Sequence, residues 1–316
     1  MNVVCYKLMA FKTKYDEILE LIDQINPVSY CKNRNYVNGN VTKLSPYISR
    51  GVISTKQVLK ASLGKVNNFK SIEKFIQELV WRDYWQMYWK IKGIDEFETN
   101  QNQNISTAIL NAQTGIEAID IAIVELYKTG YMHNHLRMYV ASIACNLSHS
   151  NWEGPAKWMY YYLKDADWGS NALSWLWVAG MNSKKKYYAN QENVNKYCFT
   201  NQTHTFLDKS YPDLISQQNP PQILNKKSTL KLKTDLPKSN CEIDSNKPVF
   251  LYNIYNLDPE WKKNENGNRI LILEPSLFEK YPISNNNLNF IIELSKNGFI
   301  DLKQDESFGN IYIKFN

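Results

Sequence analysis

The feature that most constrains the fold is a run of helix-length segments between about residues 12 and 198, without convincing strand alternation. Apolar residues recur there at helical spacing, and turn residues separate one segment from the next. A half-buried strand would need alternating apolar and polar side chains, which this part of the chain lacks. We therefore expect residues 1–198 to form an all-helical domain.

Local signals indicate where several of these helices begin and end. The amphipathic segment 12–26 precedes a proline, which we expect to end it. Ser54 is a suitable N-cap for the helix "TKQVLKASL". Residues 71–93 are apolar almost all the way round, so we expect this long helix to be buried. Residues 115–130 form another helix, closed by a final glycine.

The last third of the chain differs in character. Residues 199–246 are polar, with Pro and Lys and little periodicity, and we interpret them as a linker. The segments that follow predict strands over 248–255, 269–275 and 310–315 and a helix over 285–298. Residues 247–316 are thus expected to form a small α/β unit, short for a complete doubly wound domain.

Composition limits the class of protein. With 43% hydrophobic residues among 316, the chain is long and apolar enough for a substantial core. A net charge of +6 is compatible with a polyanionic partner. Five Cys without a CxxC pair argue against a disulfide scaffold, and four dispersed His against a metal site. Without a signal peptide or an apolar span, we expect a soluble cytoplasmic protein.

The segment "DADWGSNALSWLWVAG", residues 165–180, combines acid, amide and indole side chains. Asp167 and Asn171 are four residues apart, as are Asn171 and Trp175, so the three share a helix face. This arrangement suits a planar heteroaromatic ligand with hydrogen-bonding edges, either a cofactor or a nucleobase. On periodicity alone, an aromatic core helix with a capping Asp is the favoured alternative.

Arg137 lies on the Tyr- and Met-rich helix "HLRMYVAS" and shares a face with Asn134 and Met138. A buried guanidinium needs a carboxylate partner, and we predict that Asp165 supplies it. A salt bridge that only locks two helices is the alternative.

The segment "ELVWRDYW" places Glu78 and Arg82 four apart, with Trp81 between them. These groups could read a base edge and a phosphate, or form an ordinary intrahelical ion pair beside a core Trp. The segment "LSPYISRG" enters a helix and could bind an anion, although most such loops only cap. The lysines at 184–186 are expected to be solvated.

Taken together, these motifs resemble the flavin-binding helical domain of the photolyase/cryptochrome family. The matching blocks, in the family's order and with similar spacing, are "YCKNRN…VTKLSPYISRGVIS", "FIQELVWRDYW", "TGIEAIDIAIVELYKTGYMHNHLRM", "HSNW" and "DADWGSNALSWLWVAG". They cover about residues 30–198. The resemblance implies a mostly α fold, a photolyase-type FAD-binding domain followed by a small α/β unit that looks incomplete.

The resemblance also implies a set of site residues. FAD would be bound by Tyr30, Thr42, Ser45, Arg82, Arg137, Asp165, Asp167 and Asn171. A pyrimidine dimer flipped out of UV-damaged DNA would face Glu78, Trp81, Asn134, Met138 and Trp177. The implied activity is light-dependent splitting of cyclobutane dimers by an electron from reduced FAD, in a protein expected to be monomeric.

Two tryptophans, Trp175 and then Trp152, correspond to the electron-transfer chain of the family. Thr99 stands where its outer member is expected, so light-driven flavin reduction should be slow or use a different exit. Tyr131 replaces a family Trp, and Asn190 stands near an expected Arg. No antenna domain precedes the helical domain in this sequence, which counts against a second chromophore.

Two other functions stay open. A cryptochrome-like signalling protein would bind FAD and act through partners without repair activity. A flavin-free helical protein would keep the fold alone. The dimer-facing residues favour repair, whereas the missing antenna domain, the missing outer Trp and the short C-terminal unit favour the alternatives.

Overall fold

The computed structural model describes residues 10–94, 97, 104–237 and 243–299, and it is mainly helical. Its helices are α1 (Tyr15–Asp23), α2 (Pro27–Asn33), α3 (Ser45–Ser49), α4 (Thr55–Leu63), α5 (Glu73–Lys92), α6 (Thr107–Leu110), α7 (Glu117–Thr129), α8 (Asn134–Ser142), α9 (Glu153–Tyr162), α10 (Trp168–Val178), α11 (Gln191–Cys198), α12 (Tyr211–Ser216), α13 (Pro275–Lys280) and α14 (Asn285–Ser295). The strands are β1 (Asn104–Ser106), β2 (Lys227–Thr229), β3 (Val249–Tyr252) and β4 (Asn268–Leu271).

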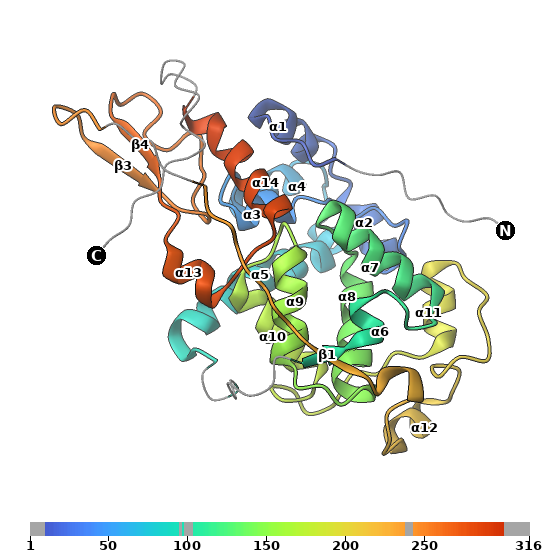
Figure 1. The fold of residues 1–316 in the computed structure, drawn as a ribbon. Helices are drawn as coiled ribbons and strands as arrows, with labels where there is room; N and C mark the ends of the chain where they lie inside the picture. The colour runs from blue at the N-terminus through green and yellow to red at the C-terminus, as the bar shows by residue number, and fades with distance from the viewer. Residues whose placement is uncertain (1–9, 95–96, 98–103, 238–242, 300–316) are drawn as a thin grey trace.

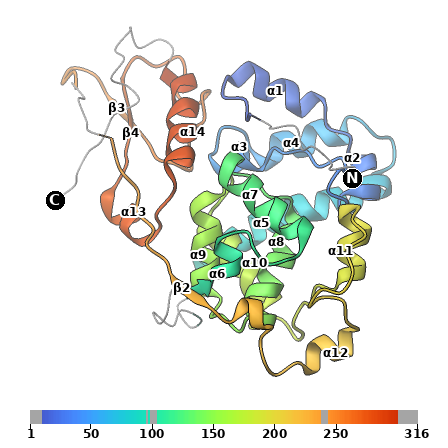
Figure 2. The ribbon, with the colours of Figure 1, turned by 45° about the vertical axis from the view of Figure 1, so that its right-hand side comes forward.

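Figures 1 and 2 show helices α2 to α12 gathered into one body, with β3, β4, α13 and α14 at one side of it. The two ends of the described chain meet there, because the backbone N–H of Tyr15 in α1 donates to Asn297 Oδ1 at 3.0 Å. Among the residues that the structure describes, no helix is long and apolar enough to cross a membrane.

Local capping sets the bounds of several helices, as the sequence predicts. Ser54 caps α4 in a complete capping box with Gln57. Gly130 ends α7 in the left-handed conformation, with φ of 74°. Asp167 caps α10 by accepting a hydrogen bond from the backbone N–H of Ser170.

Pro27 does not end a helix, contrary to the prediction. Helix α1 already ends at Asp23, and Pro27 is the first residue of α2, where its missing N–H is not needed. The side chain of Asn26 caps this second helix by accepting from the N–H of Ser29 at 2.9 Å.

Helix α5 forms over nearly the predicted range, but the prediction that it is buried is wrong. Phe75 is its buried residue, whereas Val80, Met87 and Ile91 are 53%, 61% and 73% exposed. The helix packs against α2, α4 and α10. Ile76, Leu79, Trp85 and Tyr88 are half-buried against the core, so the helix buries one side and exposes the other.

The structure adds a short strand pair that sequence patterning missed. Strands β1 and β2 pair antiparallel, with Ile105 opposite Ser228, so the expectation of no strand before residue 198 is wrong here. Three residues are too few to show an alternating pattern. The segment 199–246 also contains α12 and the buried side chains of Leu207, Leu214 and Leu224. The three-part division of the chain stays a prediction.

The C-terminal unit contains two of the three predicted strands, and residues 310–315 lie outside the described part. Strands β3 and β4 pair in parallel. β4 is mostly buried, but β3 exposes Val249 and Leu251, so it is only half-buried rather than buried as expected. The unit attaches to the helical body through Asn287 of α14, whose side-chain amide donates to the carbonyl oxygens of Tyr161 and Leu163 at 2.8 and 3.0 Å.

Candidate functional site

Two acids at the start of α10 form the centre of a buried polar cluster. Asp165 and Asp167 are each only 7% exposed. The guanidinium of Arg137, from α8, lies 3.0 Å from Asp165 Oδ2, which confirms the predicted ion pair. Arg137 Nε also donates to the carbonyl oxygen of Met132 at 2.8 Å, so the guanidinium is fixed from two sides.

Arg82 brings a second guanidinium from α5 to the same cluster. Its Nη2 lies 3.5 Å from Asp167 Oδ2 and donates to the carbonyl oxygen of Asp165 at 3.3 Å. It also donates to Ser49 Oγ, which in turn donates to the carbonyl oxygen of Asp165. One side chain thus joins α3, α5 and the turn before α10.

The alternative reading of Glu78 and Arg82 as an intrahelical ion pair is wrong. The carboxylate of Glu78 instead lies 3.2 Å from Arg34 and 3.1 Å from Lys74. Arg82 is instead directed to the carboxylate of Asp167, the carbonyl oxygen of Asp165 and the hydroxyl of Ser49. Spacing along a helix could not reveal these partners, because they come from other elements.

The carboxyl of Asp165 is held in its charged form. Burial alone would raise its pKa, but the guanidiniums of Arg137 and Arg82 and a hydrogen bond from Ser45 outweigh burial and lower the pKa below its ordinary value. A fixed negative charge therefore lies between two cations at the centre of the cluster.

Several buried polar atoms of this cluster lack a hydrogen-bond partner in the described structure. They are Asp167 Oδ2, Arg82 Nε and Ser170 Oγ. Unpaired buried groups are rare in native proteins and call for an explanation. An acceptor, a donor and a hydroxyl that all lack hydrogen bonds suit a polar ligand that offers both donors and acceptors.

Asn171 lies one turn after Asp167 on α10. Its side-chain N–H donates to the carbonyl oxygen of Ala156 in α9 at 2.9 Å. Among the described residues its amide oxygen makes no hydrogen bond, so this atom stays available to a ligand. Trp175, a further turn on, is only 2% exposed.

Tyr30 and Thr42 precede α3 in the sequence. Burial raises the pKa of Tyr30 to about 12, and its ring contacts Phe75 edge-on at 5.0 Å. Thr42 Oγ1 accepts from the N–H of Leu44 at 3.4 Å, at the entrance to α3. The side chain of Ser45 makes a hydrogen bond to Asp165. Tyr30, Thr42 and Ser45 thus supply three hydroxyl groups to the predicted site.

Tyr131 is a residue of the cluster that sequence reasoning did not assign. The amino group of Lys43 lies 5.7 Å from its ring centre and the guanidinium of Arg137 6.0 Å. Burial raises the pKa of its phenol, which Asp165 also influences. The sequence did carry a signal for this role, because a Tyr in place of a family Trp keeps an aromatic ring that cations can approach.

The residues predicted to face a pyrimidine dimer are more accessible. Trp81 on α5 is 43% exposed and Trp177 on α10 is 40% exposed. Asn134, the first residue of α8, is also exposed, whereas Met138 and Glu78 are half-buried. Helices α5, α8 and α10 thus carry both the buried cluster and these outer residues.

The two tryptophans assigned to electron transfer are both buried. Trp175 is 2% and Trp152 3% exposed, and Trp152 Nε1 donates to the carbonyl oxygen of Phe97 at 3.1 Å. Thr99 lies outside the described residues. Asn190 caps α11 by accepting from the N–H of Asn193.

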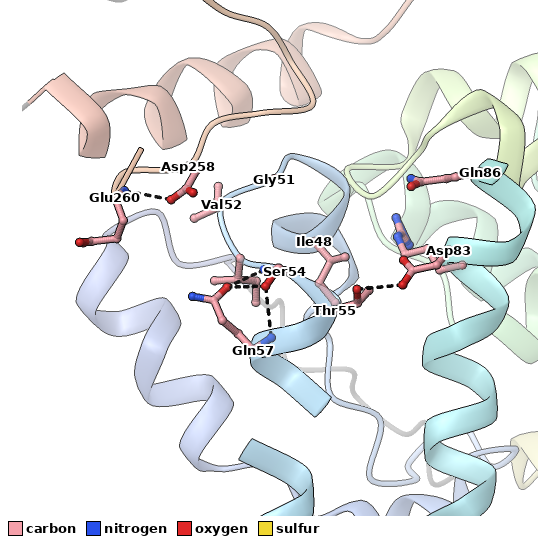
Figure 3. A pocket seen from close by; sticks show the side chains of 12 residues that line it. Ile48, Gly51, Val52, Ser54, Thr55, Gln57, Asp83, Gln86, Asp258 and Glu260 are labelled. Carbon is pink, nitrogen blue, oxygen red and sulfur yellow. Dashed lines mark hydrogen bonds between the residues drawn. The ribbon is translucent and has the colours of Figure 1, made fainter. Parts of the chain in front are cut away.

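A cavity of about 380 Å³ lies next to the cluster, between the α3–α4 turn, α5 and the C-terminal unit (Figure 3). It is lined by Ile48, Gly51, Val52, Ile53, Ser54, Thr55, Gln57, Arg82, Asp83, Gln86, Asp258 and Glu260. It shares Arg82 with the cluster, but Asp165 and Asp167 do not line it. Sequence reasoning gave no indication of this cavity.

Comparison with curated proteins finds photolyases and cryptochromes. The chain is 28% identical over 163 residues to a deoxyribodipyrimidine photo-lyase of Alkalihalophilus pseudofirmus, covering 48% of this chain and 34% of the relative. It is 32% identical over 150 residues to that of Agrobacterium fabrum (43% and 31%), and 28% over 194 residues to a cryptochrome DASH of Ostreococcus tauri (56% and 34%). The chain thus spans about a third of the length of these relatives.

Solved structures share the fold. A Synechocystis cryptochrome has a TM-score of 0.54 at 24% identity, over 60% of this chain and 44% of that one. A Sulfolobus tokodaii photolyase with two FAD molecules has a TM-score of 0.50 at 24% identity, over 59% and 44%.

A family model covers just over half of the chain. The FAD binding domain of DNA photolyase matches residues 75–246, from α5 through the cluster to the end of the polar segment. The helical fold, the cluster of half-buried arginines and buried acids, and this match agree. The chain belongs to the photolyase/cryptochrome FAD-binding family, and its cofactor is FAD.

Proposed function

We propose that the protein is a light-dependent DNA repair flavoprotein that splits cyclobutane pyrimidine dimers by electron transfer from reduced FAD. One observation carries the proposal: the two helices that hold the inner charges, α5 with Arg82 and α10 after Asp167, also bear the exposed indoles Trp81 and Trp177. A cofactor bound at the cluster would therefore lie close to a surface able to stack on bases.

The residues of the cluster fit FAD by their donor and acceptor chemistry. Arg82 and Arg137 would donate to phosphate or carbonyl oxygens, and Asp167 Oδ2, which makes no hydrogen bond within the described structure, would accept from a ring N–H or a ribityl hydroxyl. The hydroxyl-bearing side chains Tyr30, Thr42 and Ser45 would contact the phosphates and ribityl chain. Reduced FAD, when bound, supplies a one-electron donor.

Asn171 would stand beside the flavin N5. Because its N–H is engaged by Ala156, the amide oxygen would accept a hydrogen bond from a protonated N5. Such an acceptor favours the reduced flavin over the oxidised form, which has no proton at that atom.

The outer residues suit an extruded dimer. Trp81 and Trp177 would stack on the bases, Glu78 would accept from a base N–H, and Asn134 and Met138 would complete the wall. Stacking on an aromatic side chain contributes about 1–3 kcal/mol per base. A dimer is already distorted, so flipping it out of the duplex needs less energy than flipping a normal base.

A cryptochrome-like signalling function is the second candidate. The relatives include the cryptochrome DASH, which matches 56% of the chain, beside photolyases that match 48% and 58% of it. In that case FAD would bind at the same cluster, but the exposed side chains of Trp81 and Trp177 would not bind a pyrimidine dimer.

The test uses the purified full chain. Its visible spectrum reports bound flavin, and a UV-irradiated oligonucleotide incubated in light and in darkness reports repair. We expect a yellow protein, dimer loss in light only, and binding of the irradiated oligonucleotide weakened roughly tenfold by Trp81→Ala. Phe69→Ala, which removes another exposed aromatic ring at 54% exposure, is the matched control and should have no effect.

The spectrum and the repair assay together distinguish the repair function from the signalling function. A yellow protein without light-dependent dimer loss supports the signalling function. A colourless protein that does not take up added FAD contradicts both.

A further inference from the structure

We infer that the buried guanidinium of Arg50 forms, together with the C-terminal unit, an enclosed binding site for a small inorganic anion of the size of chloride. The site lies at the end of α3, where Tyr255 and Leu257 of the C-terminal unit meet Arg50 and the turn before α10. It uses none of the residues assigned above to FAD or to the pyrimidine dimer, so the inference does not rest on the proposed function.

The first observation is that Arg50 is a buried cation whose charge is not compensated. Arg50 is fully buried, and its Nε donates to the carbonyl oxygen of Lys164 at 3.1 Å. Its Nη1 and Nη2 make no hydrogen bond within the described structure. The acids of the adjoining turn are paired with other cations, Asp165 with Arg137 at 3.0 Å and Asp167 with Arg82 at 3.5 Å.

The chemistry of the guanidinium limits what can satisfy it. A guanidinium stays protonated in proteins, so Arg50 cannot escape its burial by becoming neutral. A buried charge without a countercharge is strongly destabilising. A buried water molecule would accept hydrogen bonds from the two Nη groups, but it would leave the charge uncompensated. A small anion would supply both the acceptor and the countercharge.

The second observation is a contrast with another buried arginine of the same chain. Arg269 in β4 is 6% exposed and likewise has no carboxylate partner among the described residues. Its Nη1 donates to the hydroxyl of Tyr252 at 2.7 Å and to the carbonyl oxygen of Trp261 at 3.1 Å. Its Nη2 donates to the carbonyl oxygens of Lys262 and Glu265. The chain thus provides protein acceptors for one buried guanidinium and none for the Nη groups of the other.

The third observation is that the C-terminal unit covers Arg50 closely. The N–H of Leu257 donates to the carbonyl oxygen of Arg50 at 2.9 Å, and the Tyr255 ring centre lies 5.7 Å from the guanidinium carbon. A Cβ on Gly51 would come within 2.3 Å of the carbonyl oxygen of Tyr255. The neighbouring cavity of about 380 Å³ is lined by Gly51 but not by Arg50. A ligand of the Nη groups would therefore be enclosed, which favours a small ion over an organic acid or a phosphate ester.

The nearby phenols add donors rather than acceptors of charge. The hydroxyls of Tyr160 and Tyr255 lie 3.3 Å apart, so one donates to the other and the second O–H remains a donor for a further atom. The charge of Arg50 opposes the rise in pKa that burial causes at both phenols, which shows that they lie within its electrostatic reach. Surroundings rich in donors are those that bind an anion.

The test measures urea unfolding of the purified, flavin-loaded full chain while sodium chloride replaces sodium gluconate at constant ionic strength. An ion that binds only the folded state stabilises it by mass action. The unfolding equilibrium constant should therefore fall by up to about tenfold for each tenfold rise in chloride. Bromide, which has the same charge and a similar size, should act in the same way.

Two variants separate this site from a general effect of salt. Arg50→Met has a similar length without the charge, and its unfolding constant should not respond to chloride. Arg269→Met is the matched control, because it removes another buried guanidinium whose hydrogen bonds are already made within the protein. The control is expected to be less stable but to keep the full dependence on chloride.

A second measurement needs no variant and serves if Arg50→Met does not fold. In crystals of the unaltered full chain soaked in bromide, anomalous scattering should locate an ion in contact with Nη1 and Nη2 of Arg50. A soaked crystal without bromide there, or a response to chloride that is absent or equal in Arg50→Met, would overturn the inference. Loss of flavin absorbance in Arg50→Met would identify a phosphate of FAD as the partner of Arg50 and would overturn it as well.

Discussion

The pair formed by Arg137 and Asp165 gives the sharpest quantitative prediction. Asp165→Asn keeps the shape of the side chain but removes a charge that is 6% exposed and 3.0 Å from a guanidinium. Removing one partner of a buried pair typically costs 3–5 kcal/mol, because the other charge stays buried without compensation. Arg137 retains 21% side-chain exposure, so we expect the low end, about 3 kcal/mol.

The chain contains a matched control for this change. Lys233 and Asp235 also approach within 3.0 Å, but their side chains are 83% and 66% exposed. Asp235→Asn should therefore cost less than about 1 kcal/mol, since exposed pairs contribute little. The two pairs have the same distance and differ strongly in burial.

The pH dependence follows from the direction of the pKa shift. The folded pKa of Asp165 lies below the unfolded value of 3.8, so its contribution to stability is present above that value and is lost as the pH falls below it. Urea unfolding followed by tryptophan fluorescence should show the full difference between the unaltered protein and Asp165→Asn at pH 7. The difference should narrow below about pH 4. A loss under 1 kcal/mol at pH 7, or one that does not narrow in acid, would refute the reasoning.

Three further predictions concern the fold and use the same unfolding assay. Gly130→Ala should cost about 1–2 kcal/mol because φ is 74° and a Cβ would approach Lys164 Cγ to 2.8 Å; an unchanged midpoint would contradict this. Ser54→Ala removes the N-cap of α4 and should cost about 1 kcal/mol, and Ser54→Thr should recover most of it. On α5, Phe75→Ala should cost about 3–5 kcal/mol, whereas Ile91→Lys, at 73% exposure, should stay within about 0.5 kcal/mol; equal effects would refute the one-sided burial of the helix.

Features that depend on neighbouring residues could be predicted from the sequence. Ser54, Gly130 and Asp167 set helix ends through hydrogen bonds and backbone angles within one turn. The local sequence alone is therefore enough to predict these ends. Pro27 was misread because proline is compatible both with the first turn of a helix and with the end of the preceding one. The exposure of α5 depends on which elements pack against it, and periodicity carries no such information.

The same distinction applies to the candidate site. The Arg137–Asp165 pair could be predicted because a buried guanidinium requires an acid and few acids were near. The partners of Arg82 could not, because Ser49 and Asp167 lie 33 and 85 positions away in the chain and only the fold brings them together. The roles of these residues toward FAD rest on the resemblance to the family, which residue patterns alone did not single out.

The C-terminal unit contacts the end of α3, next to the polar cluster, and does not merely follow the helical domain in sequence. Arg50, at the end of α3, is fully buried, and its guanidinium lies 5.7 Å from the ring centre of Tyr255. The N–H of Leu257 donates to the carbonyl oxygen of Arg50 at 2.9 Å, and a Cβ on Gly51 would collide with the backbone of Tyr255.

This close contact has an electrostatic consequence. Burial raises the pKa of Tyr255, and the Arg50 cation opposes that rise, as it also does for Tyr160. Asp167, one of the predicted flavin contacts, acts on the same two phenols in the opposite sense. Without residues 253–257, Tyr160 would lose the hydroxyl of Tyr255 as a partner, and Arg50 would lose its contacts with the Tyr255 ring and the N–H of Leu257. The C-terminal unit is therefore part of the electrostatic surroundings of the cluster, and its loss should lower the stability of the helical body.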